Sequence, residues 1–161
     1  MTKMRIAVFS ITILALVVLA SSCHRDDVEQ QNTYSKDNIV MSGAQETPAN
    51  SSSATGSLNV SYSRLSRTLT YQFSWQNLSD TITGIHIHGL APAGFPASIF
   101  QNILTTKNEK QFPYSKGSSS GSLFIDGVAI KEADLLNGLY YLNIHTKTYT
   151  GGEIRGQIVF Q

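Results

Sequence analysis

The residues of this chain whose types and spacing could perform chemistry are three histidines, His86, His88 and His145. His86 and His88 stand two apart in a segment in which they alternate with Ile85 and Ile87. In a β-strand this alternation places both imidazoles on one face, about 6.5–7 Å apart, with the isoleucines on the other. Imidazole is a good ligand for copper and zinc, and three histidines with an open coordination position can be catalytic. The residues therefore predict a candidate copper or zinc site.

Two further residues, Glu153 and Arg155, are candidates for the surroundings of this site. The last two strands should pair as an antiparallel hairpin, so the residue numbers of any two directly opposed residues add up to the same total. If His145 and Arg155 lie on the same outer face, this total must be even. His145 then lies opposite Glu153 or Arg155, unless a bulge at 151–152 changes the register. Beside a metal, the charge of Arg155 could attract a small anion.

A structural role is the alternative for the same side chains. Histidines on strands often hydrogen-bond to neighbouring loops, and an exposed Glu–Arg ion pair contributes little to stability. Other chemistries have less support, because no serine lies in a Gly-x-Ser-x-Gly motif and no glycine-rich phosphate loop joins a strand to a helix. We therefore expect a protein that is not an enzyme, with no cofactor unless the histidines hold copper or zinc.

The elements that must position these side chains are short strands. Alternating apolar residues predict a hairpin of 57–62 and 68–75, which buries Trp75, with a turn at 63–66. One short helix is expected at 130–137, ended by Gly138. Further strands are expected at 39–45, 85–88, 98–104, 111–114, 122–126, 140–145 and 154–160, with a Ser/Gly loop at 115–120. This pattern predicts an all-β fold, an antiparallel Greek-key β-sandwich or small barrel with one short helix.

Residues 1–22 have the character of an export signal. Lys3 and Arg5 precede an apolar run over 6–20, which is short for a membrane span and suits a signal sequence. Small residues and then Cys23, the single cysteine, follow directly and are similar to the bacterial lipoprotein signal, in which the cysteine becomes lipidated. We therefore expect a lipid anchor on Cys23 and a location at the bacterial cell envelope, periplasmic or surface-exposed. Residues 23–37 are polar and aperiodic, which predicts a flexible tether.

The composition argues against nucleic-acid binding. The 161 residues contain 12 Lys+Arg and 11 Asp+Glu, and only 14% of them are charged, whereas nucleic-acid-binding proteins carry a basic stripe. Without Lys3 and Arg5 the balance is 10 basic to 11 acidic side chains, so acyl chains rather than charge would hold the protein on a membrane. We expect a monomer with an unidentified protein or small ligand as its partner.

Four blocks of the sequence resemble one domain family, the CHRD domain. The blocks are MSGAQETPANSSSATGSL (41–58), TGIHIHGLAPAG (83–94), NGLYYLNIHT (137–146) and GGEIRGQIVF (151–160). That domain was first described as a repeat in chordin, an extracellular growth-factor antagonist, and also occurs singly in bacterial secreted proteins. The departures from the family pattern, such as Thr47-Pro48-Ala49-Asn50, fall in loops. The resemblance implies a CHRD domain over 38–161, and we expect a non-catalytic binding or adhesion module.

A second, local resemblance supports the alternative function. A His-x-His strand, a later histidine and an arginine near the C-terminus are similar to part of Cu/Zn superoxide dismutase, where they meet outside a β-barrel. The bridging histidine, the zinc loop and the disulfide of that family have no counterpart here. The alternative is therefore a copper- or zinc-binding protein that uses His86, His88 and His145, with redox or superoxide-related activity.

Overall fold

A computed structural model of the protein describes residues 32–104 and 115–160. Within these residues the chain forms eight strands, all paired antiparallel in the order β5-β4-β7-β8-β1-β2-β3-β6, with a short helix, α2. The bounds are β1 Thr33–Ser42, η1 Gly43–Gln45 (a 3₁₀ turn), β2 Thr55–Ser63, β3 Thr68–Gln76, β4 Ile82–Gly89, β5 Ser98–Asn102, β6 Lys116–Phe124, α2 Glu132–Leu136, β7 Tyr140–Thr146 and β8 Ile154–Ile158. The expected all-β, antiparallel fold is confirmed.

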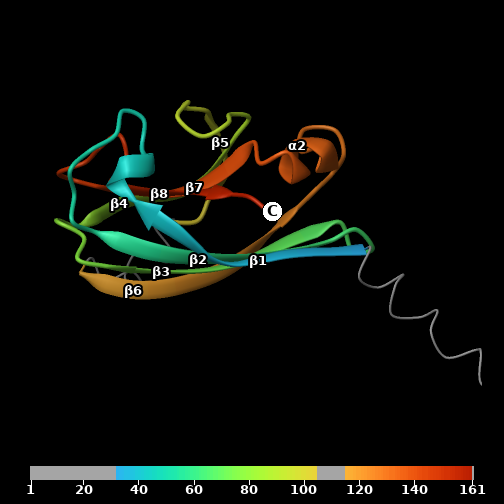
Figure 1. Cartoon of the computed structure of the whole chain (residues 1–161), viewed down its shortest axis with the longest axis horizontal. Coiled ribbons are helices and arrows are strands. Elements are labelled where there is room, and N and C mark those ends of the chain that lie inside the picture. The colour runs from blue at the N-terminus through green and yellow to red at the C-terminus, as the bar shows by residue number, and fades with distance from the viewer. Residues whose placement is uncertain (1–31, 105–114, 161) are drawn as a thin grey trace, which may run out of the picture. The chain divides into compact units, whose positions relative to one another are not determined.

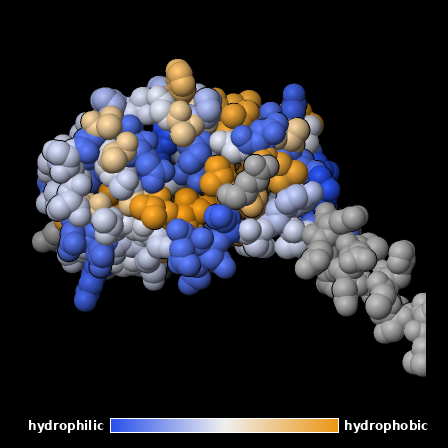
Figure 2. All heavy atoms as spheres, in the orientation of Figure 1, coloured by the Kyte–Doolittle hydropathy of each residue, from blue (hydrophilic) through white to orange (hydrophobic). Residues whose placement is uncertain are grey.

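The sheet folds over into two layers. β1 and β8 meet through the pair Ser42 and Arg155, and this narrow connection lets β5-β4-β7-β8 lie across from β1-β2-β3-β6 (Figure 1). On the other side, the Gln101 side chain of β5 accepts a hydrogen bond from the Tyr71 hydroxyl and donates one to the Ser122 carbonyl of β6. The result is a nearly closed β-sandwich, with hydrophobic residues in a band between the layers (Figure 2).

The β2–β3 hairpin forms as its alternation predicts. Leu58 pairs with Phe73 across the hairpin, and the two side chains face the core. Phe73 lies between Tyr71 and Trp75, with ring centroids 6.2 and 5.7 Å away. All these side chains are buried, because residues two apart on a strand share one face. The prediction that Trp75 belongs to the core is confirmed.

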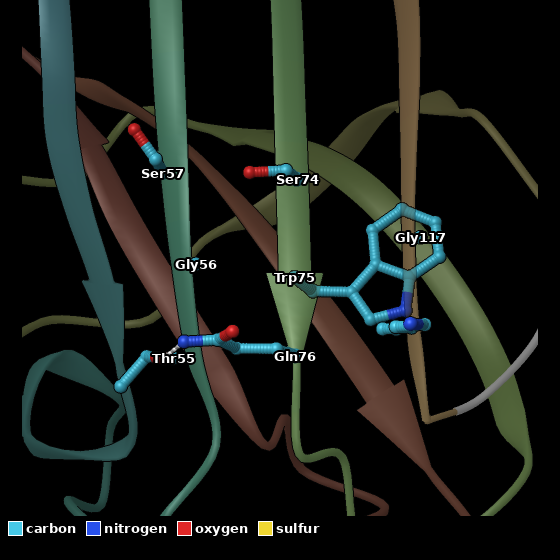
Figure 3. A pocket seen from close by; sticks show the side chains of 8 residues that line it. Thr55, Gly56, Ser57, Ser74, Trp75, Gln76 and Gly117 are labelled. Atoms are coloured by element: carbon cyan, nitrogen blue, oxygen red, sulfur yellow. Dashed lines mark hydrogen bonds between the residues drawn. The ribbon is translucent and has the colours of Figure 1, made fainter.

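The predicted Ser/Gly loop at 115–120 is wrong, because residues 116–120 belong to β6. β6 pairs with β3 along its whole length, and its Gly117 and Gly121 lie opposite the large inward rings of Trp75 and Tyr71. A Cβ atom on Gly117 would lie 2.5 Å from the Trp75 ring, which crosses this glycine in Figure 3. Glycine here therefore makes room for a neighbouring side chain and does not mark a loop.

β1 begins earlier than the sequence pattern indicates. Thr33 pairs with Ser63 and Tyr34 stacks on Tyr62, with ring centroids 6.4 Å apart. Residues 33–37, expected in the tether, therefore belong to the sheet, and the predicted strand at 39–45 ends at Ser42. The signal segment, Cys23, the tether up to residue 31 and the predicted strand at 111–114 lie outside the described residues.

α2 is shorter than the predicted helix at 130–137 but ends at the expected place. Gly138 follows it with a φ of +72°, a conformation that favours glycine and stops a helix. In the two stretches that the structure describes, no helix combines the length and apolar character needed to cross a membrane.

Candidate metal centre

The pairing of β4, β7 and β8 brings the three histidines to one face. Gly84 pairs with His145 and His86 with Asn143, while Asn143 in turn pairs with Arg155. The residue numbers of each pair between β7 and β8 add up to an even total, as expected if His145 and Arg155 share the outer face. Ile85, Ile87 and Ile144 point the other way, and none of them is exposed to solvent. One nitrogen from each of the three imidazoles lies within 4.8 Å of the other two.

A glycine gives the His86 ring its place in this cluster. A Cβ atom on Gly84 would lie 2.6 Å from Cε1 of His86 and 2.9 Å from its Nε2. The ring therefore folds over Gly84 toward His145, and their centroids are 4.8 Å apart. The three rings converge because β4 carries no side chain at the position opposite His145.

Backbone carbonyls fix the tautomers of two of the rings. Nδ1 of His88 lies 2.9 Å from the Ala97 carbonyl oxygen, and Nδ1 of His145 lies 2.9 Å from that of Thr150. A carbonyl oxygen can only accept, so both Nδ1 atoms carry the hydrogen and both Nε2 atoms keep a lone pair. Nε2 of His88 is buried with no hydrogen-bond partner among the described residues. An N–H held by a carbonyl while the other nitrogen stays free is the usual arrangement of a metal-binding histidine.

Asn143 is a neighbour of the site that the sequence analysis missed. Its Oδ1 lies 3.1 Å from Nε2 of His145, while a hydrogen bond from its side chain lowers the pKa of Glu46. The Asn143 side chain therefore links the imidazole of His145 to the buried carboxyl group of Glu46. Its position two residues before His145 on an alternating strand was the available signal.

Arg155 positions His88 through an aromatic ring. Its guanidinium lies 3.5 Å from the Tyr141 ring centroid, and this ring stacks on His88 at 4.8 Å and 4°. The guanidinium also donates to the carbonyls of Phe95 and Pro92, as well as to Gln157 and Thr47. Arg155 is only 1% exposed, so it presents no open charge to an entering anion. It instead holds the loop after β4 over the outer face.

Glu153 is not brought into the histidine cluster. Its carboxylate accepts hydrogen bonds from the hydroxyls of Ser52 and Thr146 and from both the hydroxyl and the backbone N–H of Ser79. The preceding Gly152 has a φ of +125°, which redirects the chain where a bulge was considered. Glu153 therefore ties two loops, which carry Ser52 and Ser79, to the end of β7.

Burial keeps all three imidazoles neutral at pH 7. It lowers the pKa of His86 to about 4, with smaller contributions from His145 and His88. Burial also lowers the pKa of His88 and that of His145, although their hydrogen bonds to backbone carbonyls act in the opposite direction. Neutral imidazole is the form that binds metal ions.

Glu46 is a buried carboxyl behind Asn143. Burial raises its pKa from 4.5 to about 7, although Asn143, the Thr47 backbone and Arg155 act to lower it. Its Oε1 is buried without a hydrogen-bond partner in the part of the chain that the structure describes. The absence of a side chain at Gly152 makes room for the carboxyl group.

Glu46→Gln should stabilise the metal-free protein at high pH and leave it unchanged at low pH. Below about pH 4.5 the carboxyl is protonated in both the folded and the unfolded chain. As the pH rises toward 7, only the unfolded chain loses the proton, so the free energy of unfolding of wild type falls by up to about 3 kcal/mol. Urea denaturation with a chelator at pH 4.5 and pH 8 measures this. If the free energies of unfolding of Glu46→Gln and wild type differ by the same amount at both pH values, the prediction is contradicted.

A shallow groove in the other layer is separate from the histidines. Its volume is about 620 Å³, and it is lined by residues of β2, β3 and β6, including Thr55 and Lys116 at the starts of β2 and β6 (Figure 3). Gln76 donates a hydrogen bond to Thr55 across its floor. The lining contains no histidine, cysteine or carboxylate, so the groove offers no metal ligands.

Of the comparisons with known proteins, the one with domain families gives a match. Searches of curated proteins and of solved structures find no match to the chain. The CHRD domain family matches residues 38–158, which are three quarters of the chain and include all three histidines. The chain therefore belongs to the CHRD domain family.

Proposed function

We propose that this protein is an exported, lipid-anchored, non-catalytic binding module whose ligand is one transition-metal ion, copper in preference to zinc. The observation that carries the proposal is the convergence of His86, His88 and His145 within 4.8 Å, with the Nδ1 hydrogens of two rings held by carbonyls. A purely structural histidine does not need its second nitrogen left buried and unpaired, because an unpaired buried polar atom costs free energy.

The geometry is close to what one ion requires. Ligand nitrogens at 2.0–2.1 Å from a shared ion lie at most about 4.2 Å apart, so a small inward rotation of the rings completes the site. His86 is only partly buried and its Nδ1 has no hydrogen-bond partner among the described residues, so its ring can make this adjustment. Three neutral nitrogen donors favour Cu²⁺ over Zn²⁺ by the usual order of affinities.

Metal titration of the full mature protein tests this proposal. We expect one Cu²⁺ per chain, a larger thermal shift with Cu²⁺ than with Zn²⁺, and nitrogen hyperfine structure in the electron paramagnetic resonance spectrum. At a free metal concentration 100 times Kd, binding should stabilise the fold by about 2.7 kcal/mol. If neither metal binds in stoichiometric amount, the metal-binding proposal is overturned.

The anchor is proposed on the sequence around Cys23. Cys23→Ala should release the protein from the membrane fraction into the soluble fraction, because no acyl chain can then be attached. Ser21→Ala, which keeps a small residue before the cysteine, is the matched control and should remain with the membrane. Fractionation followed by immunoblotting measures both. Retention of Cys23→Ala in membranes would contradict lipidation.

A further inference from the structure

One end of the domain carries exposed hydrophobic side chains on two neighbouring loops. Leu65 in the β2–β3 turn is 78% exposed, Val128 in the loop before α2 is 80% exposed, and Phe124 at the end of β6 is 57% exposed. The loops are joined, because the Ile125 amide donates to the Arg67 carbonyl and the Arg67 guanidinium lies over the Phe124 ring. Three of the eight exposed large hydrophobic residues in the described part of the chain are thus gathered here.

The same end is where the chain enters the domain from its N-terminal segment. Thr33 pairs with Ser63, directly before the turn that carries Leu65. Tyr34 packs against Tyr62 and lies under the guanidinium of Arg64, 4.9 Å from its ring centroid. These contacts fix the entry point. We call this end, formed by Thr33, the turn 64–67 and the loop 124–131, the entry end.

The length of the connecting chain limits which end of the domain can face the membrane. From Cys23 to Thr33 are ten residues, which span at most about 36 Å when fully extended. β2 carries the opposite end, at Thr55, roughly 26 Å from the entry end. The entry end can therefore touch the bilayer with the connecting chain in almost any conformation, whereas the opposite end can do so only if that chain is stretched to about 26 Å of its 36 Å.

We propose that the entry end rests on the lipid bilayer, with Leu65, Phe124 and Val128 inserted among the headgroups. This inference rests on the proposed lipid anchor at Cys23. The entry end carries Arg64, Arg67 and Lys131 against Asp126, and Arg64 pairs with Glu132 of the adjoining helix α2, so an anionic membrane surface does not repel it. Exposed apolar side chains next to an anchor gain from contact with lipid in proportion to the apolar area that they bury.

The orientation also sets the three histidines at different distances from the lipid. Tyr140, at the start of β7, is at the entry-end side, since Ile158 pairs with it and Phe160 packs on Tyr34. His88 pairs with Tyr141, next to Tyr140, whereas His145 lies five residues further along β7, roughly 16 Å from Tyr140. His145 is therefore the ring farthest from the lipid, and His88 is the nearest.

Fluorescence quenching on vesicles tests the orientation. The full protein, lipidated during expression, is reconstituted into phosphatidylethanolamine–phosphatidylglycerol vesicles with an environment-sensitive dye on Val128→Cys, or on Ser53→Cys as the matched control. Ser53 is exposed and lies just before β2, at the opposite end. With spin-labelled lipid as the quencher, we expect at least threefold stronger quenching at position 128 than at position 53.

The experiment distinguishes a failure of the proposed lipid anchor from a failure of the proposed orientation. If the unlabelled wild-type protein does not float with the vesicles, the anchor is wrong and the orientation falls with it. If it floats but positions 128 and 53 are quenched equally, the anchor stands and the orientation is overturned. A Leu65→Ser/Val128→Ser variant should reduce quenching of a dye at Lys131→Cys while flotation is unchanged.

Discussion

Replacing His88 by alanine should lower the affinity for Cu²⁺ by roughly 100-fold or more, beyond the 10–100-fold typical of outer-shell changes. His88 is the ring held most firmly, because the Ala97 carbonyl fixes its Nδ1–H and Tyr141 stacks on its face. Without it, two nitrogens remain and the ion loses its third ligand. Competition with a chelator of known affinity measures the loss, and the copper-induced thermal shift should disappear.

Two control variants separate a lost ligand from a disturbed fold. His24→Ala, in the predicted tether, should bind copper as wild type does. Asn143→Ala should weaken binding by about 10–100-fold, the usual effect of removing a group that orients a ligand. The metal-free unfolding temperature of each variant shows whether the sandwich is intact. Equal copper-induced shifts in wild type and in a folded His88→Ala protein would overturn the metal proposal.

Truncating Phe73 should destabilise the domain by about 3–5 kcal/mol, the usual cost of removing a buried aromatic ring. Phe73 is 1% exposed, packs between Tyr71 and Trp75 and lies opposite Leu58. The loss is a large part of a typical stability of about 5–15 kcal/mol. Equilibrium denaturation in urea, with the folded fraction followed by tryptophan fluorescence, measures it.

The neighbouring Gln72 provides the control for this prediction. Its side chain is exposed on the outer face of β3, so Gln72→Ala should change the free energy of unfolding by less than about 0.5 kcal/mol. Since the two positions differ by one residue, a similar loss in both variants would mean that the inner and outer faces of β3 contribute alike. A loss below 1 kcal/mol for Phe73→Ala would contradict its place in the core.

The local pattern of the sequence was enough to predict the strands whose one face is apolar. β2 and β3 alternate strictly, so their hairpin, its turn and the burial of Trp75 follow from side-chain periodicity. The same periodicity placed His86 and His88 opposite Ile85 and Ile87. Alternation with a period of two identifies the buried face because shifting the strand by one residue would expose all of its apolar side chains.

Two segments could be identified only from the three-dimensional structure. The sequence predicted a strand at 122–126, which overlaps the end of β6, but not the earlier part of β6. Residues 116–121 are rich in serine and glycine without apolar alternation, and they form a strand because β3 offers them a partner whose rings need the space above Gly117 and Gly121. The start of β1 is polar, and it joins the sheet through pairing with β2 and the packing of Tyr34. Long-range pairing outweighs local propensity in both cases.

For the site, the sequence by itself determined which imidazoles share a face, and the tertiary structure decided what surrounds them. The loops before β5 and β8 return to supply the carbonyls of Ala97 and Thr150, and no periodicity encodes such a return. Glu153 bonds to two loops and to the end of β7, and Arg155 lies against Tyr141, because a charged group that is buried in the sandwich needs partners from distant parts of the chain. Strand alternation is a local property of the backbone, whereas hydrogen-bond partners depend on how distant segments pack.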